Sequence, residues 1–170
     1  MSLLTAHDRL IERVCKELTD RFGSIDFKSE PLLFDFTSYY EAELGKDLIR
    51  HIISFEKLIL PDALPAIKLE TNAVEESLAD VHGNRRINID PGYIALAHLI
   101  LATCKGFAHR PYLRDGVYAD LTVVFRAQTF QALEWTFPDY RSAEMLSLLT
   151  KIRNDYRAQL RRMVRDGNHS

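Results

Sequence analysis

The stretch RRINIDPGYIALAHLILATC, residues 85–104, decides the fold because it joins a charged segment to a long apolar run. Its opening, RRINI, alternates polar and apolar side chains, which predicts a short strand. Asp90 and Pro91 are then placed to cap and begin a helix, since aspartate accepts N–H donors at an N-cap and proline fits the first turn. Because the run after them is apolar nearly all round, the sequence predicts a central, buried helix from Asp90 onward.

The residues ahead of this stretch predict two helices and two strands. A helix ends at Gly23, with Thr5 and Asp8 as a capping box and an apolar stripe at Leu10, Ile11, Val14, Leu18 and Phe22. Residues 25–37 favour a strand that tolerates Pro31 only at an edge or a bulge, and residues 38–45 favour one or two helical turns ending at Gly45. Residues 50–59 predict a second strand. A second helix follows with Pro65 in its first turn, Gly83 beyond its end, and a buried stripe at Ile67, Val74, Leu78 and Val81.

The residues after the stretch predict a meander and a terminal helix. Asp115-Gly116 is typical of a two-residue hairpin turn, and a further strand near FQALEW follows a turn at residues 127–129. The last helix is amphipathic, with an apolar stripe at Met145, Leu149, Ile152, Tyr156, Leu160 and Met163.

The order of these elements predicts an α+β fold. Helix, strand, strand, helix, strand is a ferredoxin-like β-α-β-β-α-β unit whose opening strand is missing or reduced to a stub at residues 1–4. We expect this half to be extended by the buried helix, a three-stranded antiparallel meander and the C-terminal helix. All 170 residues are expected to form a single domain.

Composition indicates a soluble, cytoplasmic protein. Hydrophobic residues make up 46% and charged residues 27% of the chain, and the net charge of -2 gives no general attraction to polyanions. The two cysteines, Cys15 and Cys104, are expected to be buried free thiols in a reducing compartment. No stretch is typical of a secretion signal or a membrane span, so no membrane partner is expected.

Several phrases together resemble one family: RFGSIDFKSEPLLFDFTSYYEAELG, SFEKLI, IKLETNAVE, RRINIDPGYIALAHLILAT, AHRPYLRDGVYADLTVVF and WTFPDYRS. The chain is similar to the DUF4416 family, small bacterial and archaeal proteins with a domain of unknown function. The resemblance implies a prokaryotic protein and an apolar strand before the first helix. Some relatives carry a GTP-binding label, but a P-loop or G-x-G-x-x-G fingerprint needs closely spaced glycines. The seven glycines here stand at positions 23, 45, 83, 92, 106, 116 and 167.

The hairpin at Asp115-Gly116 holds the strongest candidate site. If these two residues form the loop, Arg114 pairs with Val117 and Leu113 with Tyr118, so His109 and Asp120 become diagonal neighbours on one face. A carboxylate that orients an imidazole is what a general base requires, so His109 and Asp120 are the candidate catalytic residues. The candidate ligand-binding residues are Arg110 and Tyr112, predicted on the opposite face of the hairpin, and Asp139, Tyr140 and Arg141 of PDYRS.

These residues leave two functions open. Arginine forks and aromatic faces suit a small anionic or nucleotide-like ligand. The alternative is a non-catalytic partner-binding or scaffold domain, in which His109 and Asp120 are an exposed cross-strand pair. Asp90 with Tyr93 could line an anion site at a helix N-terminus, although plain N-capping by Asp90 explains the same residues.

Other sites find less support in the sequence. A metal site at His109, Asp120 and Asp90 lacks any ligand spacing, so none is predicted. The basic residues of the last helix complement its dipole, and nucleic acid binding is not favoured. The sequence names no cofactor, substrate or oligomeric state, and it leaves open whether the protein is an enzyme.

Overall fold

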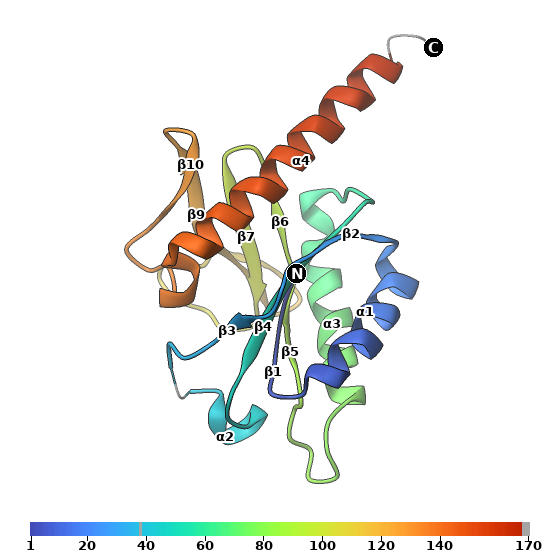
Figure 1. Cartoon of the computed structure of the whole chain (residues 1–170), viewed down its shortest axis with the longest axis vertical. Helices are drawn as coiled ribbons and strands as arrows, with labels where there is room; N and C mark the ends of the chain where they lie inside the picture. The colour runs from blue at the N-terminus through green and yellow to red at the C-terminus, as the bar shows by residue number, and fades with distance from the viewer. Residues whose placement is uncertain (38, 168–170) are drawn as a thin grey trace. The chain divides into compact units, whose positions relative to one another are not determined.

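The computed structural model describes residues 1–37 and 39–167 and has an α+β fold with two antiparallel sheets (Figure 1). The chain divides into two compact units. The first comprises Met1–Tyr93 and Leu101–Asp120, and the second comprises Ile94–Ile100 and the described part of Leu121–Ser170. The expected single domain stays a prediction.

The first sheet is built around the opening strand. Its order is β2 (Ile25–Lys28), β4 (Ile49–Phe55), β1 (Ser2–Thr5), β5 (Asn88–Asp90), and the two-residue β3 (Leu32–Leu33) also pairs with β4. All of these pairings are antiparallel. The opening strand is therefore present, contrary to the alternative that it is missing. Every residue of β1 is buried, because the strand lies between two others. Four residues are too few for alternation to reveal such a strand.

The two faces of β1 pack into separate clusters. Leu3 belongs to a core with residues of α1 (Asp8–Phe22) and α3 (Leu64–Ser77), two helices that lie side by side on one face of the sheet (Figure 1). Leu4 points to the other face, where Phe34, Leu44 and Leu48 surround it beside α2 (Glu41–Leu44). This alternation is what period-two side-chain geometry requires of a strand covered on both faces.

Most predicted elements of the first unit are confirmed. Helix α1 ends at Gly23, whose φ of 99° suits a residue without a Cβ. Helix α2 ends at Gly45 as expected, although Ser38 of the predicted turns lies outside the described residues. The expected stripe of α3 is wrong at one position: Val81 is 95% exposed because the helix ends at Ser77.

The predicted central helix from Asp90 onward is wrong. Residues 88–103 form three strands instead: β5, β6 (Gly92–Ile94) and β7 (His98–Thr103). The Ala95 N–H donates to the His98 carbonyl at 2.9 Å and closes the turn between β6 and β7. Strand β7 lies between β6 and β9. The sequence of a strand covered on both faces is a continuous apolar run, because neither face needs polar side chains. Periodicity cannot distinguish such a run from a buried helix.

The second sheet has the order β10-β9-β7-β6, with β9 (Val117–Arg126) and β10 (Thr129–Ala132), and β8 (Tyr112–Arg114) also pairs with β9. The predicted hairpin is confirmed: Asp115 and Gly116 have φ values of 54° and 75°, as a two-residue turn requires. The predicted strand after residues 127–129 is confirmed as β10.

Two short 3-10 helices, η1 (Pro61–Ala63) and η2 (Pro138–Arg141), complete the chain with the long helix α4 (Ala143–Gly167). Helix α4 packs against η2 and β10, and Met145 and Leu149 are buried. The predicted stripe is buried only in its first half, since Met163 is 56% exposed. Among the helices of residues 1–37 and 39–167, none combines the length and apolar character that crossing a membrane requires.

Candidate functional site

A bulge in the hairpin changes the predicted faces. Arg114 pairs with Val117 as expected, but Tyr112 rather than Leu113 pairs with Tyr118, so Leu113 is an extra residue in β8. Because side chains alternate along a strand, one extra residue moves every preceding side chain to the other face. The rings of Tyr112 and Tyr118 accordingly lie 5.3 Å apart. The prediction that Tyr112 and Arg110 face away from Asp120 is wrong.

Arg110 and His109 converge on a single carboxylate oxygen. The Arg110 Nε donates to Asp120 Oδ2 at 2.8 Å, and His109 Nε2 lies 3.7 Å from the same oxygen. Asp120 is buried, with 6% of its surface exposed. The predicted neighbourhood of His109 and Asp120 is therefore present, at a distance of charge interaction rather than hydrogen bonding.

A tight turn before β8 lets the side chains of both His109 and Arg110 reach Asp120. The Arg110 N–H donates to the Phe107 carbonyl at 3.0 Å, and Arg110 Nη1 donates to the Lys105 carbonyl at 3.2 Å. The Phe107 ring lies edge-on to His109 at 5.3 Å. Backbone and aromatic contacts thus fix the orientation of both side chains.

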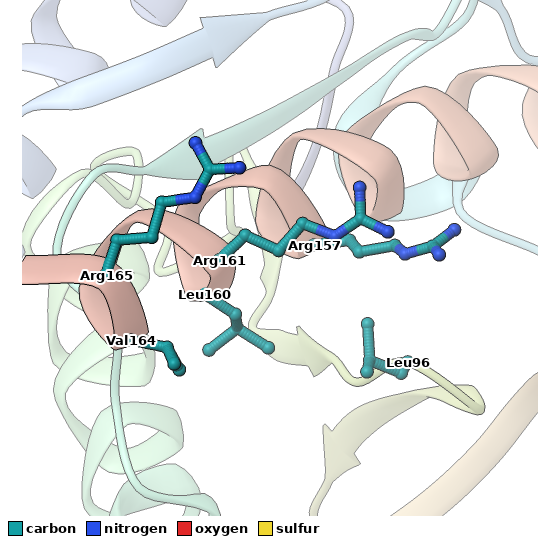
Figure 2. A pocket seen from close by; sticks show the side chains of 6 residues that line it. All are labelled: Leu96, Arg157, Leu160, Arg161, Val164 and Arg165. Atoms are coloured by element: carbon teal, nitrogen blue, oxygen red, sulfur yellow. The ribbon is translucent and has the colours of Figure 1, made fainter. Parts of the chain in front are cut away.

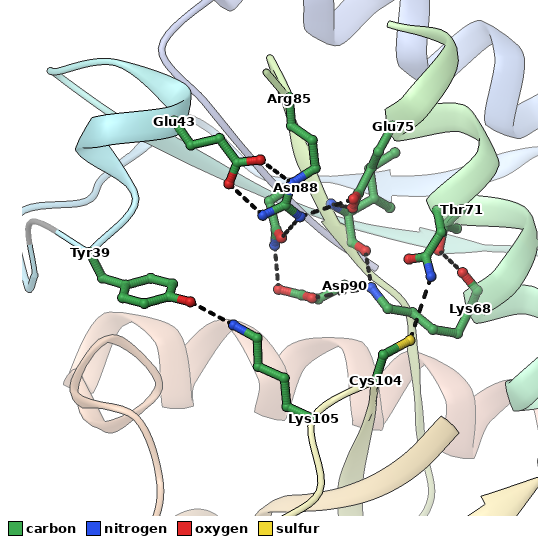
Figure 3. A network of polar contacts seen from close by, with 12 residues as sticks. Tyr39, Glu43, Lys68, Thr71, Glu75, Arg85, Asn88, Asp90, Cys104 and Lys105 are labelled. Carbon is green, nitrogen blue, oxygen red and sulfur yellow. Dashed lines mark hydrogen bonds and ion pairs between the residues drawn. The ribbon is translucent and has the colours of Figure 1, made fainter. Parts of the chain in front are cut away.

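Asp90 lies in a second polar cluster of the same unit (Figure 3). It is the last residue of β5 and caps no helix, so the predicted helix N-terminal anion site does not exist. Asn88 Nδ2 donates to Asp90 Oδ2 at 2.7 Å, and Lys68 Nζ lies 3.6 Å from Asp90 Oδ1. Lys68 is buried and donates to the Ile89 carbonyl at 3.0 Å. The carbonyl and the carboxylate offset the free energy that burying the Lys68 ammonium costs.

Arg85 joins the carboxylates at the other end of this cluster. Its guanidinium binds Glu43 in a bidentate manner at 2.6 and 2.7 Å and donates to Glu75 at 3.1 Å. The hydrogen bonds from Arg85 hold the pKa of Glu43 below its ordinary value. Burial raises the pKa of Glu75, although Lys68, the Ile89 N–H and Arg85 oppose that rise. These contacts form a polar network along β5, the end strand of the first sheet.

Lys105 contacts both Arg110 and Tyr39. Its Nζ donates to the Tyr39 hydroxyl at 2.7 Å and its carbonyl accepts from Arg110. The hydrogen bond from Lys105 lowers the pKa of Tyr39. Beside it, Asn72 Nδ2 contacts Cys104 Sγ at 3.5 Å. Cys104 is exposed, so the predicted burial is wrong for this thiol, whereas it is confirmed for Cys15.

A family model described as "Domain of unknown function (DUF4416)" matches residues 1–156. The chain belongs to the DUF4416 family. No curated protein and no solved structure matches this DUF4416 chain.

The other predicted ligand-binding residues of the DUF4416 chain differ in exposure. Tyr112 is 60% exposed, and its hydroxyl accepts from the Gly116 N–H at 3.4 Å. Tyr93 lies in β6, where partial burial raises its pKa. Among the predicted ligand-binding residues, Tyr112 is therefore the aromatic side chain with the most exposed surface.

Asp139, Tyr140 and Arg141 lie in η2 of the second unit. Asp139 and Tyr140 are buried. Arg141 donates to the carbonyls of Thr136 and Glu134 at 2.6 and 2.7 Å, so its guanidinium ties down the loop before η2. Ligand contacts by these three residues of the DUF4416 chain stay predictions.

Sequence reasoning missed Lys68, Lys105 and Tyr39. Lys68 follows Ile67 on the buried side of α3, and a charged residue beside an apolar stripe was the available signal. Nothing in the spacing of Tyr39 and Lys105 indicates their contact, because they are 66 residues apart. Within residues 1–37 and 39–167, no group of three or more histidine, cysteine, aspartate or glutamate side chains could hold a metal ion.

Proposed function

We propose that this DUF4416 chain binds a small anionic molecule on its first unit, beside Arg110, Lys105 and His109. The observation that carries the proposal is the convergence of Arg110 and His109 on one buried oxygen of Asp120. Arg110 and His109 approach this carboxylate. The Lys105 carbonyl accepts from Arg110, so a second cationic residue lies beside the pair, and the local charge favours an anion. Asp120 and the Lys105 carbonyl hold the guanidinium in one orientation, which reduces the entropy lost on binding.

His109 is the proton-transfer group in this proposal, and Asp120 is the residue that orients it. Tyr112 supplies an exposed aromatic face, which suits a nucleotide-like ligand. Contacts by Asp90 and Tyr93 of the same unit are secondary parts of the proposal, because Asn88 already engages Asp90. Ligand contacts by Asp139, Tyr140 and Arg141 are a separate proposal for the second unit, where backbone carbonyls already engage Arg141.

The fold and location belong to the same proposal. We infer a ferredoxin-like first unit, supported by the antiparallel order β2-β4-β1-β5 with α1 and α3 on one face. The free thiols Cys15 and Cys104 support a reducing cytoplasm as its location, and a prokaryotic source stays what the family resemblance implies.

The test is a thermal-shift screen with inorganic phosphate, nucleotides, phosphorylated sugars and carboxylic acids, followed by calorimetric titration of any compound that binds. A ligand at 100 times its dissociation constant stabilises by about 2.7 kcal/mol. For a chain of this size that corresponds to a shift of roughly 5–10 °C.

The matched variants are Arg110→Lys, His109→Ala and Arg114→Ala. Arg114 is an exposed arginine of the same hairpin, so its replacement should leave the shift unchanged, whereas the other two should reduce or abolish it. A shift that survives in Arg110→Lys and His109→Ala would refute the site.

A second function, binding of a partner protein, is favoured by one observation. Phe107, Tyr112 and Leu113 are exposed apolar side chains within seven consecutive residues, at 70%, 60% and 40% exposure. Such a patch is typical of an interaction surface. A screen in which no compound shifts the transition would favour this function over the first.

A further inference from the structure

The second unit has a groove along the outer half of α4. The groove has a volume of about 570 Å³, and Figure 2 shows its lining side chains: Leu96, Arg157, Leu160, Arg161, Val164 and Arg165. Leu96 comes from the turn between β6 and β7, and the other five come from α4. No residue of the site proposed above takes part.

Arg153 holds this groove in a fixed shape. Its Nε donates to the Leu96 carbonyl at 2.7 Å, and its guanidinium lies over the Phe125 ring, 3.4 Å from the centroid. Arg153 is itself buried. The turn that carries Leu96 is therefore tethered to the helix, and the groove exists before any ligand arrives.

The charged side of the groove is a row of arginines. Arg157, Arg161 and Arg165 follow one another at four-residue spacing, which places them about 6 Å apart along one helix face. Like charges at this spacing destabilise a helix. Within residues 1–37 and 39–167, the side chains of Arg157 and Arg161 form no ion pair and no hydrogen bond. An occupant with carboxylates would relieve this repulsion.

The apolar side of the groove is incompletely covered. Val164 is 66% exposed and Leu96 is 42% exposed, and both lie beside the arginine row. Together the two sides require an occupant that presents aliphatic and anionic groups at once.

We propose that this groove binds an acidic amphipathic helix of a partner protein. Carboxylates four residues apart on a helix repeat at about 6 Å, which matches the arginine row. Aliphatic side chains between them fill the space around Leu160 and Val164, as in other helix-in-groove complexes.

The lining disfavours the other occupants. A second copy would bring one arginine row against another in a symmetric contact. Single-stranded nucleic acid is held by aromatic stacking platforms, and the six lining residues include no aromatic side chain. A membrane surface favours a broad apolar helix face, whereas the apolar side chains here line a groove.

The test uses a fluorescent helical peptide with glutamate at every fourth position and leucine beside it, measured by fluorescence anisotropy against the whole chain. We expect salt-sensitive binding that weakens at least about tenfold in the Arg157→Ala/Arg161→Ala double variant. The control is Arg162→Ala, an exposed arginine of the same helix that does not line the groove, and its affinity should stay within about twofold of wild type.

Reversing the charge of the groove and of the peptide tests whether the arginine row itself recognises the peptide. The Arg157→Glu/Arg161→Glu variant should lose the acidic peptide and gain a peptide with lysine in place of glutamate. Circular dichroism of each variant verifies that α4 is retained. The proposal is overturned by no binding of the acidic peptide at low salt, by an equal loss in Arg162→Ala, or by tighter arginine-dependent binding of a single-stranded oligonucleotide or phosphatidylserine vesicles.

Discussion

The turn between β9 and β10 is built from two residues that disfavour its backbone conformation. Ala127 and Gln128 have φ values of 47° and 64°, and they join Arg126 directly to its cross-strand partner Thr129. Two-residue hairpin loops with positive φ at both positions prefer Asn-Gly or Asp-Gly. We therefore predict that the double substitution Ala127→Asn/Gln128→Gly stabilises the protein.

The size of the effect follows from the backbone angles. A residue with a Cβ in the left-handed region costs about 1–2 kcal/mol, and asparagine tolerates this region better than alanine. Glycine at position 128 removes the steric cost but adds about 0.5–1 kcal/mol of backbone entropy. The net gain should be about 1–2 kcal/mol in the free energy of unfolding, or roughly 2–8 °C in the melting temperature of a chain this long.

The first hairpin supplies the reciprocal control. Gly116 has a φ of 75°, and a Cβ added there meets no atom within 4 Å. The substitution Gly116→Ala therefore changes only the backbone preference, and it should destabilise by about 1 kcal/mol. Both hairpins then test the same conformational cost with opposite signs.

The assay is urea unfolding at 25 °C followed by circular dichroism, with the slope m compared between variants. An unchanged m with a shifted midpoint reports a change in stability alone. The reasoning fails if Ala127→Asn/Gln128→Gly is no more stable than wild type while Gly116→Ala loses stability. If neither variant differs from wild type, positive φ carries no measurable cost in these turns.

Three further predictions concern polar contacts and are checked by the same urea unfolding. Arg110→Ala leaves the buried Asp120 with only part of its charge compensation, so it should cost about 3 kcal/mol, against less than about 0.5 kcal/mol for the exposed Arg114→Ala. The pKa of Glu43 is lowered in the folded state, so its contribution is present above the ordinary glutamate pKa and is lost as the pH falls through the folded value. Glu43→Gln should therefore cost about 0.5 kcal/mol at pH 7, and that difference from wild type should vanish in acid, where a constant difference would contradict it. Thr136→Val removes a buried hydroxyl that donates to the Thr122 carbonyl and accepts from the Leu133 N–H, and it should cost about 1–3 kcal/mol, whereas a neutral result would show that water replaces these bonds.

The sequence predicts correctly those helices and turns whose conformation depends on residues close together in the chain. Helix α1 has a one-sided apolar stripe and a glycine at its end, and the turn at Asp115-Gly116 has the side chains that its φ values require. Strand β7 is different, because pairing with β9, which follows later in the chain, rather than local preference decides its conformation, and β6 pairs with β7 across a short turn. Asp90 and Pro91 are expected to cap and begin a helix, but strand pairing forms β5 and β6 on either side of Pro91 instead.

The candidate site could be predicted in composition but not in geometry. His109, Arg110 and Asp120 stand out in the sequence as a charged group around a hairpin turn. Consecutive side chains of a regular strand point to opposite faces, so His109 and Arg110 could not both reach one carboxylate in an uninterrupted strand. Two irregularities change this: the bulge at Leu113 shifts the register, and the turn closed by the Arg110 N–H on the Phe107 carbonyl takes His109 out of the strand. Gly106 and Pro111 flank the turn, but no glycine or proline marks the bulge at Leu113. The chemistry proposed for this site therefore depends on a one-residue shift that only the three-dimensional structure reveals.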